Sequence, residues 1–249
     1  EPIDNWLKKN NWAIYTHQIE TLKLSENGYT VVATTFDKEV EKADEWVAAQ
    51  KEEGFNFLVE EADVTSFDDC AAMVQRVEDH VGPIDVLVNC AGITRDGFLK
   101  NMDESNWDAV LSTNLDGVFN MTKNVLEPML SRGFGRIINI SSVNGQRGQF
   151  GQTNYSAAKA GMHGFTMALA QEVARKGITV NSVSPGYVAT QMVMKIDEGI
   201  RNELISQIPM QRLGKPTEIA NTVGFLASDQ ADYITGANIP VNGGLFTSF

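Results

Sequence analysis

The sequence predicts an α/β fold of the doubly wound Rossmann type, a parallel sheet with helices on both faces. Short runs of apolar and β-branched residues alternate with longer helical stretches along the chain. The short runs are continuously apolar, which is typical of strands that are buried on both faces of a parallel sheet. The 249 residues contain no repeat and no linker, so we expect residues 1–249 to form a single domain.

The elements that this pattern predicts follow one another along most of the chain. The predicted strands are Thr30–Thr35, Phe57–Glu61, Ile84–Asn89, Arg136–Ser141, Ile178–Ser184 and Ala237–Val241. The predicted helices are Val40–Glu53, Asp68–Val81, Val118–Arg132, Tyr155–Lys176 and Pro216–Ser228. Because ligands of such sheets bind beyond the carboxyl ends of the strands, the residues that follow each strand are candidates for a binding site.

The composition argues against several classes of function. The net charge of −12 disfavours a nucleic-acid surface, and it would repel an anionic ligand unless a local basic patch attracts it. No apolar run reaches the ~18 residues of a membrane span, and the first residues lack the layout of a secretion signal. The three histidines are scattered, so we expect no metal site. Cys70 and Cys90 make no disulfide framework, which favours a cytoplasmic location.

The stretch from Asn139 to Gly161 contains the strongest candidate for chemistry. Tyr155 and Lys159 are four residues apart on a predicted helix, so their side chains share one face. We expect the ammonium to lower the pKa of the phenol from its ordinary ~10, which would make the phenol a usable general acid or base. Ser142 ends the preceding strand, where its hydroxyl could hold a carbonyl oxygen while the phenol protonates it.

In type and spacing, Ser142, Tyr155 and Lys159 resemble the catalytic residues of the short-chain dehydrogenase/reductase family. A lone Tyr-x-x-x-Lys match would more often be an ordinary amphipathic helix, but the serine at the strand end and the glycines between them favour the family. The resemblance implies a nicotinamide-dependent oxidoreductase in which these three residues are catalytic. It also implies that Asn114, in Thr113-Asn114-Leu115, is the family's fourth catalytic residue, which holds a water in a proton relay behind the lysine.

The first 28 residues depart from the family pattern. Related enzymes have T-G-x-x-x-G-x-G between their first strand and first helix, where the turn receives the cofactor pyrophosphate. Here Trp12–Thr16 is the expected strand and His17–Asn27 the expected helix, yet no glycine precedes Gly28. Either a loop is absent from the sequence as given, or the gene has lost it, or the region folds differently. We favour the first explanation, which predicts a separation well beyond ~3.8 Å between adjacent Cα atoms near Thr16.

Other segments resemble cofactor-binding segments of the family. Asp63-Val64 follows a strand where the family's aspartate contacts the adenine, and Asn89-Cys90-Ala91-Gly92 resembles its N-N-A-G, whose small residues admit the cofactor. Ser184–Thr190 resembles the segment beside the nicotinamide, in which Val188 would touch the ring edge and Thr190 the carboxamide. The cofactor contacts implied are Thr16, Thr35, Lys38, Asp63, Val64, Asn89, Ala91, Gly92, Tyr155, Lys159, Pro185, Gly186, Val188 and Thr190.

The end of the Thr30–Thr35 strand favours NADPH as the cofactor. An acidic residue there would bind the ribose 2′-hydroxyl of NAD and repel a 2′-phosphate. Neither Thr34 nor Thr35 is acidic, and Lys38 follows. Asp37 nevertheless leaves NADH open as an alternative.

Within the family, the chain is similar to the acetoacetyl-CoA reductases of polyhydroxyalkanoate synthesis, most clearly in the segment Gln149–Tyr155. This similarity implies NADPH-dependent reduction of the 3-oxo group of acetoacetyl-CoA by a homotetramer built from the long helices and the last strand. Residues 187–214 would form either a substrate lid or a surface helix pair. The candidate substrate contacts are Gln149, Phe150, Gln152 and Tyr187.

Two alternatives stay open. A 3-oxoacyl-(acyl-carrier-protein) reductase has the same catalytic set, although such enzymes tend to have arginine where Gln171 stands. A non-catalytic Rossmann-fold binding or scaffold protein is supported only by the missing glycine-rich turn. Saturable binding of NADPH would separate an enzyme from such a scaffold.

Overall fold

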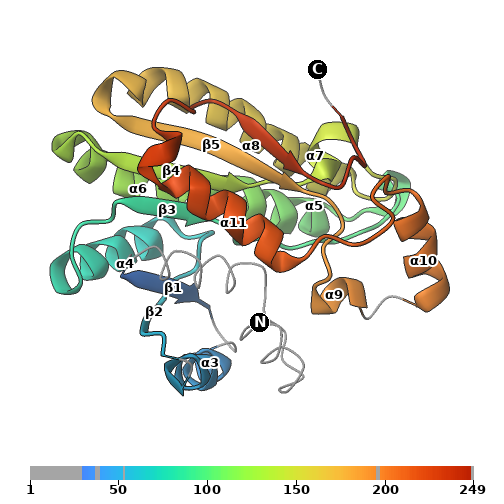
Figure 1. Cartoon of the computed structure of the whole chain (residues 1–249), viewed down its shortest axis with the longest axis horizontal. Coiled ribbons are helices and arrows are strands. Elements are labelled where there is room, and N and C mark those ends of the chain that lie inside the picture. The colour runs from blue at the N-terminus through green and yellow to red at the C-terminus, as the bar shows by residue number, and fades with distance from the viewer. Residues whose placement is uncertain (1–29, 37–39, 53, 195–196, 248–249) are drawn as a thin grey trace.

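The computed structural model of the chain describes residues 30–36, 40–52, 54–194 and 197–247 (Figure 1). The predicted first strand, the predicted first helix and the question of the glycine-rich turn lie outside the described residues, as do Thr16 and Lys38.

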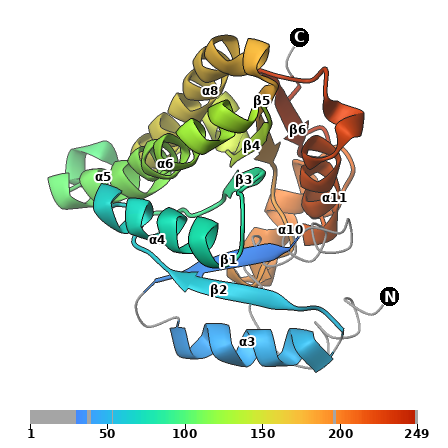
Figure 2. The same ribbon diagram turned by 90° about the vertical axis from the view of Figure 1, so that its left-hand side faces the viewer.

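All strands of the described residues are paired in parallel, as the sequence predicts. One pair joins β1 and β2, and a second sheet has the order β3-β4-β5-β6. Figures 1 and 2 both show β1 on the side of its pair that faces β3. The strands are β1 Val31–Thr35, β2 Phe57–Glu61, β3 Val86–Asn89, β4 Gly135–Ile140, β5 Ile178–Pro185 and β6 Asn238–Val241.

Helices cover both faces of the larger sheet (Figure 2). The helices α6 and α8 pack on one face and α11 packs on the other, whereas α3 lies against β2. The predicted parallel α/β fold with helices on both faces is therefore confirmed. The longer helices are α3 Val40–Glu52, α4 Phe67–His80, α6 Gly117–Arg132, α8 Thr153–Val173 and α11 Pro216–Ala227. None of the described helices is both long and apolar enough to cross a membrane.

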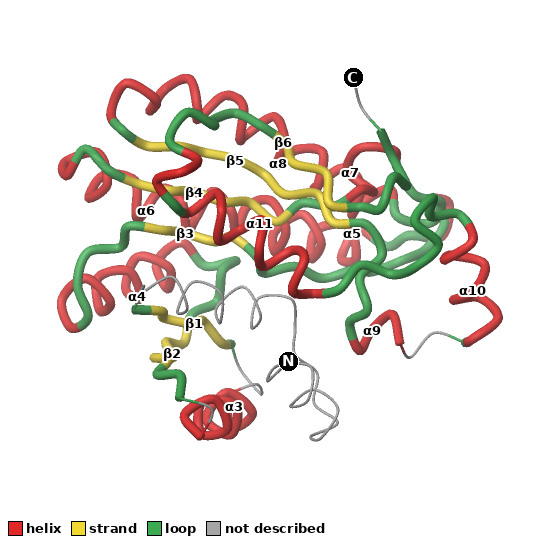
Figure 3. Tube along the Cα trace, in the orientation of Figure 1, coloured by secondary structure: helices red, strands yellow, loops and turns green. Residues whose placement is uncertain are grey.

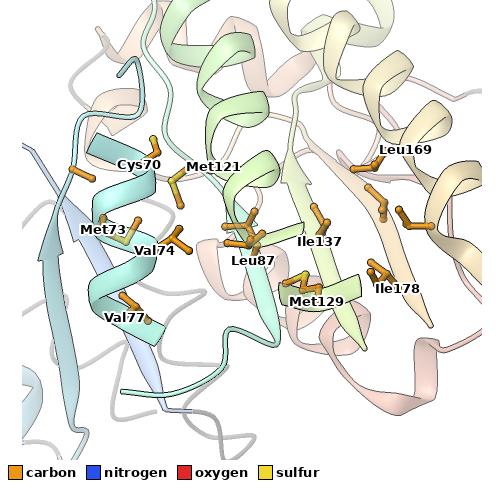
Figure 4. Packing of buried hydrophobic residues seen from close by; sticks show 14 of the residues in the cluster. Cys70, Met73, Val74, Val77, Leu87, Met121, Met129, Ile137, Leu169 and Ile178 are labelled. Carbon is orange, nitrogen blue, oxygen red and sulfur yellow. The ribbon is translucent and has the colours of Figure 1, made fainter. Parts of the chain in front are cut away.

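Strand β4 shows why the predicted strands are apolar throughout. All six of its residues are buried. Because side chains alternate between the two faces of a strand, Ile137 belongs to the core beneath α4, α6 and α8, while Ile138 and Ile140 belong to the core beneath α11. Figure 4 shows Ile137 within the first of these cores, between Met129 of α6 and Ile178 of β5.

Several short elements were not predicted individually because their sequences are too short to show a helical period, although a surface helix pair was one expectation for residues 187–214. One of them, α7, begins where the side chain of Ser142 accepts a hydrogen bond from the Asn144 N–H at 3.1 Å. Another, α10, is capped by the Asp197 carboxylate. Figure 3 shows α7, α9 and α10 at the same end of the molecule, towards which the strands run in Figure 1. These elements are α5 Glu104–Leu111, the π-helix η3 Ser112–Asp116, α7 Val143–Arg147, α9 Gln191–Met194 and α10 Glu198–Ser206.

Candidate active site

The end of β4 holds the predicted catalytic lysine through two reciprocal hydrogen bonds. The Lys159 ammonium, which is 3% exposed, donates to the Ile140 carbonyl at 2.8 Å. In return, the Ser141 hydroxyl donates to the Lys159 carbonyl at 2.8 Å. A buried ammonium needs such partners, because an unpaired charge is costly away from water. The two bonds fix α8 against the end of β4, directly beside Ser142.

The same helix brings Tyr155 to Ser142 and Lys159. Tyr155 lies in the first turn of α8, and its phenol is near enough to the Ser142 side chain for this side chain to lower the pKa of the phenol. The Lys159 Nζ atom lies 5.6 Å from the centroid of the Tyr155 ring. The structure thus brings the serine, tyrosine and lysine to one place, as their spacing predicts.

The expected direction of the tyrosine pKa shift is wrong in this structure. Burial raises the pKa of the Tyr155 phenol above its ordinary value of 10, and only the hydrogen bond with Ser142 lowers it. The nearby Cys90 and Asp96 raise this pKa further. Desolvation of the phenolate is the largest of these effects, and Lys159 is not among the groups that lower the pKa. The phenol therefore keeps its proton at neutral pH, which is the form that a general acid requires.

Asn114 lies within the π-helix that separates α5 from α6. Its side chain is fully buried and clamps the backbone of Ile93: its oxygen accepts from the Ile93 N–H at 2.9 Å, and its amide donates to the Ile93 carbonyl at 2.8 Å. A single π turn inside a helix is frequent at functional sites. Here it places Asn114 beside the residues after β3, where it fixes their backbone.

The residues after β3 fit the close approach of a cofactor. Ala91 and Gly92 are both exposed. A Cβ atom at Gly92 would lie 2.5 Å from Asn114 Oδ1 and 3.5 Å from Lys159 Nζ. Gly92 thus adjoins two predicted catalytic side chains and leaves an uncovered backbone next to the ammonium. A ligand could therefore approach this backbone closely beside the ammonium.

Asn89, the first residue of the same segment, has a different role from Ala91 and Gly92. Its side-chain amide donates to Asn139 Oδ1 at 2.9 Å and to Thr122 Oγ1 at 3.1 Å. Asn139 in turn donates to Thr166 Oγ1 at 2.9 Å. These buried side chains form a polar chain that joins the ends of β3 and β4 to α6 and α8. Asn89 therefore stabilises the site through buried hydrogen bonds in the protein interior.

The segment after β5 is held against β6. The Gly186 N–H donates to the Val241 carbonyl at 3.0 Å, and a Cβ atom at Gly186 would lie only 2.8 Å from the Asn242 Cα atom. Pro185, the last residue of β5, pairs with Val241. The Val188 side chain is buried in the core beneath α11, so only its backbone is available to a ligand. The next turn begins at Thr190, whose carbonyl accepts from the Met194 N–H.

The residues predicted to bind the adenine end lie at the ends of β1 and β2. The Thr35 carbonyl accepts from the Ala62 N–H at 3.0 Å, which joins the two strand ends. Asp63 caps the following turn through Thr65, and the Val64 carbonyl accepts from the Asn120 side chain at 2.9 Å. A cavity of about 370 Å³ adjoins them and is lined by Phe36, Glu61, Ala62, Asp63, Asp69, Ala72 and Arg76.

The four predicted substrate contacts differ in how many contacts their side chains already make within the protein. The Gln152 side chain accepts from Asn144 Nδ2 at 3.0 Å and donates to Asp96 Oδ2 at 2.9 Å. Phe150 is 81% exposed and meets the Phe98 ring edge-on at a centroid distance of 5.0 Å. Gln152 therefore ties the loop after α7 to the loop after β3, while Phe150 presents an apolar surface to solvent.

Arg147 is the link between the other two predicted contacts. Its Nη2 atom donates to Gln149 Oε1 at 3.2 Å and to the Tyr187 hydroxyl at 3.4 Å. Sequence reasoning missed Arg147, Asp96 and Asn144. Their contacts join loops that are far apart in sequence, and no spacing signals such contacts.

The segment 187–214 is closed at its two ends. The Gly214 N–H donates to the Tyr187 carbonyl at 2.9 Å, and the Ala189 N–H donates to the Gly214 carbonyl at 2.8 Å. Near its end, Ile208 is buried, and the Met210 N–H donates to the Gly243 carbonyl at 3.1 Å. The segment is therefore a loop on a fixed base, with α9 and α10 in its outer part.

Comparison with known proteins agrees with this geometry. A family model described as enoyl-(acyl carrier protein) reductase matches residues 21–246. The chain belongs to the short-chain dehydrogenase/reductase family and is an NAD(P)-dependent oxidoreductase.

Its relatives include enzymes with named substrates. The chain is 60% identical to an acetoacetyl-CoA reductase of Allochromatium vinosum, over 90% of this chain and 91% of the relative. It is 50% identical to an acetoacetyl-CoA reductase of Cupriavidus necator, over 90% of each. It is 46% identical to a 3-oxoacyl-(acyl-carrier-protein) reductase of Staphylococcus aureus, over 90% of this chain and 91% of the relative.

The contact between α7 and α8 gives a prediction about Ser142. A Cβ atom at Gly145 would lie 2.7 Å from the carbonyl carbon of Lys159 and 2.9 Å from the Ala160 nitrogen. Because both neighbours are backbone, Gly145→Ala must push α7 away and move Ser142 from the phenol. We expect kcat to fall on the order of 10²-fold while the circular dichroism spectrum stays unchanged. A folded variant with wild-type kcat would contradict this placement.

A second prediction concerns His163, whose ring lies 3.2 Å from the Ser184 hydroxyl. Burial, with a smaller effect of Lys159, lowers the pKa of His163 below its ordinary 6.5. His163 therefore binds a proton more readily in the unfolded chain than in the folded protein, and its protonation favours unfolding. The contribution of the neutral ring to the free energy of unfolding is complete above about pH 6.5 and is lost as the pH falls below that value. The free energy of unfolding, measured in urea, should fall more between pH 7.5 and pH 5.5 in the wild type than in the variant His163→Gln. Equal losses would show that the ring titrates normally.

Proposed function

We propose that this protein reduces the 3-oxo group of acetoacetyl-CoA to the 3-hydroxy group, with NADPH as the reductant. The observation that carries the proposal is the meeting of a half-buried, protonated phenol, a serine hydroxyl and a buried ammonium at the end of β4. Two relatives that match 90% of this chain, at 60% and 50% identity, are named acetoacetyl-CoA reductases. We place the reaction in polyhydroxyalkanoate synthesis on the same similarity.

The reaction needs a proton for the oxygen and a hydride for the carbon of the ketone. Tyr155 supplies the proton as general acid, because desolvation raises the pKa of its phenol and keeps it neutral at physiological pH. Ser142 hydrogen-bonds to the same oxygen as its negative charge develops. When bound, the reduced nicotinamide supplies the hydride.

Lys159 acts on the phenolate that remains after the proton is transferred. The ammonium lies on the same helical face as the phenol, at 5.6 Å from the ring centroid. The ammonium attracts the Tyr155 side chain strongly only after the phenol has become a phenolate. Lys159 therefore stabilises the product of proton transfer more than the starting state. Ile140 and Ser141 keep the lysine in place for this role. We assign Asn114 to the relay behind Lys159, with its clamp on Ile93 as support.

The cofactor-binding residues fit a dinucleotide that extends from Gly92 to the ends of β1 and β2. Ala91 and Gly92 would take the nicotinamide riboside together with Tyr155 and Lys159, and Pro185, Gly186, Val188 and Thr190 would lie beside the nicotinamide. Asp63, Val64 and the neighbouring cavity would take the adenine. Because β1 ends in Thr34 and Thr35 without an acid, a 2′-phosphate meets no carboxylate on this strand, which supports NADPH over NADH.

The substrate would enter between the loop after α7 and the segment 187–214, which we propose is a lid. We assign Gln149, Phe150 and Tyr187 to this entrance, with Gln152 holding the adjoining loops together. We prefer the CoA thioester to the carrier-protein thioester because Gln171, which is exposed on α8, offers no positive charge to an acidic carrier protein.

We propose that the protein is a cytoplasmic homotetramer. The long helices α6 and α8 leave Phe119 and Met167 about half exposed, and burial of such side chains against a second copy would stabilise an assembly. Neither of the chain's two cysteines, Cys70 and Cys90, is in a disulfide, which suits a reducing compartment.

The substrate assignment is tested by steady-state kinetics with matched thioesters. We expect kcat/KM with NADPH to be at least tenfold higher for acetoacetyl-CoA than for acetoacetyl-(acyl-carrier-protein). Crotonyl-CoA serves as the control for the enoyl reduction in the name of the matching family model, and it should not be reduced. A preference for the carrier-protein thioester would overturn the choice of substrate.

The acid role of Tyr155 is tested by Tyr155→Phe, which removes the proton donor and keeps the ring. We expect kcat to fall by 10²- to 10⁴-fold, with the dissociation constant of NADPH, measured by its fluorescence, changed much less. A variant that retains wild-type kcat would assign proton transfer to another group.

A further inference from the structure

We propose that Arg147 is a positioning residue that holds the two sides of the substrate entrance, Gln149 and Tyr187, at a fixed separation. This inference rests on the proposed function, since it assigns those two residues to the binding of the acyl thioester. Arg147 itself does not touch the reacting atoms in this arrangement.

The contacts of Arg147 cross between two segments of the chain. One guanidinium nitrogen, Nη2, donates to Gln149 in the loop after α7 and to the Tyr187 hydroxyl at the start of the segment 187–214. These partners are 38 positions apart in the sequence. The Nε atom is buried and has no hydrogen-bond partner among the described residues, so the base of the guanidinium is enclosed while Nη2 makes both contacts.

The same short helix links this bridge to the catalytic serine. Ser142 caps the beginning of α7, and Arg147 is its last residue. Five residues at 1.5 Å each span about 7 Å, so the entrance lies one short helix away from the reacting oxygen. Gly145, between them, presses on the backbone of α8. The position of Arg147 is therefore tied to that of Tyr155 and Lys159.

Arginine suits this position better than lysine. Its planar guanidinium presents several N–H donors in fixed directions, whereas a lysine ammonium is a point charge on a flexible stem. Both acceptors are uncharged, and Arg147 makes no ion pair within 4.0 Å among the described residues. The bridge thus depends on the geometry of the guanidinium and not on charge pairing.

The test compares Arg147→Met, Arg147→Lys, Tyr187→Phe and the double variant Arg147→Met/Tyr187→Phe in steady-state reduction of acetoacetyl-CoA. We expect Arg147→Met to raise KM for the thioester about tenfold, as for loss of hydrogen bonds to a charged group, with kcat and the KM of NADPH nearly unchanged. Arg147→Lys should recover less than half of this change. Because the two residues act together, the double variant should lose less than the product of the single losses in kcat/KM.

Hydrogen exchange tests the same bridge without substrate. The amides of Ala189 and Gly214, which close the base of the segment, should exchange faster in Arg147→Met than in wild type. Arg175→Met, at an exposed position after α8, is the control and should match wild type in both measurements.

Four outcomes would overturn the proposal: an unchanged KM in Arg147→Met, full recovery by lysine, multiplicative losses in the double variant, or unchanged exchange. If wild type does not reduce acetoacetyl-CoA, the proposed function fails, and the exchange measurement then decides by itself whether Arg147 holds the loop to Tyr187.

Discussion

The paired hydrogen bonds between Lys159 and the end of β4 are the constraint on which the rest of the site depends. The ammonium donates to the Ile140 carbonyl, and the Ser141 hydroxyl donates to the Lys159 carbonyl. Together they fix both the side chain and the backbone of one turn of α8. Since Tyr155 lies one turn earlier on that helix and Ser142 directly follows Ser141, fixing Lys159 also fixes the phenol relative to the hydroxyl.

Buried polar side chains stabilise this arrangement from below. The chain of hydrogen bonds from Thr122 through Asn89 and Asn139 to Thr166 crosses two strand ends and reaches the helices on one face. Each of its members is buried and paired, and such fully satisfied networks make a structure rigid. The proposed catalytic groups consequently rest on a stiff frame, whereas the loops of the proposed substrate entrance are joined through the side chains of Arg147 and Gln152.

In the proposed reaction, desolvation gives Tyr155 and Lys159 complementary parts. A desolvated phenol holds its proton until a developing alkoxide takes it, and a buried ammonium nearby favours the phenolate left behind. The lysine is thus more effective after proton transfer than before it. This explains how a tyrosine whose pKa is raised in the resting protein can still serve as an acid in a ketone reduction.

The sequence by itself determined the parallel α/β fold and the four residues Asn114, Ser142, Tyr155 and Lys159 that the structure assembles. These features depend on local periodicity and on short spacings, which a chain carries whatever its packing. The tertiary structure decided the direction of the Tyr155 pKa shift, because that depends on how completely neighbouring segments exclude water. It also decided that Asn89 and Val188 turn their side chains inward, and that Arg147 joins Gln149 to Tyr187. These contacts arise between segments that only folding brings together, so no pattern along the chain records them.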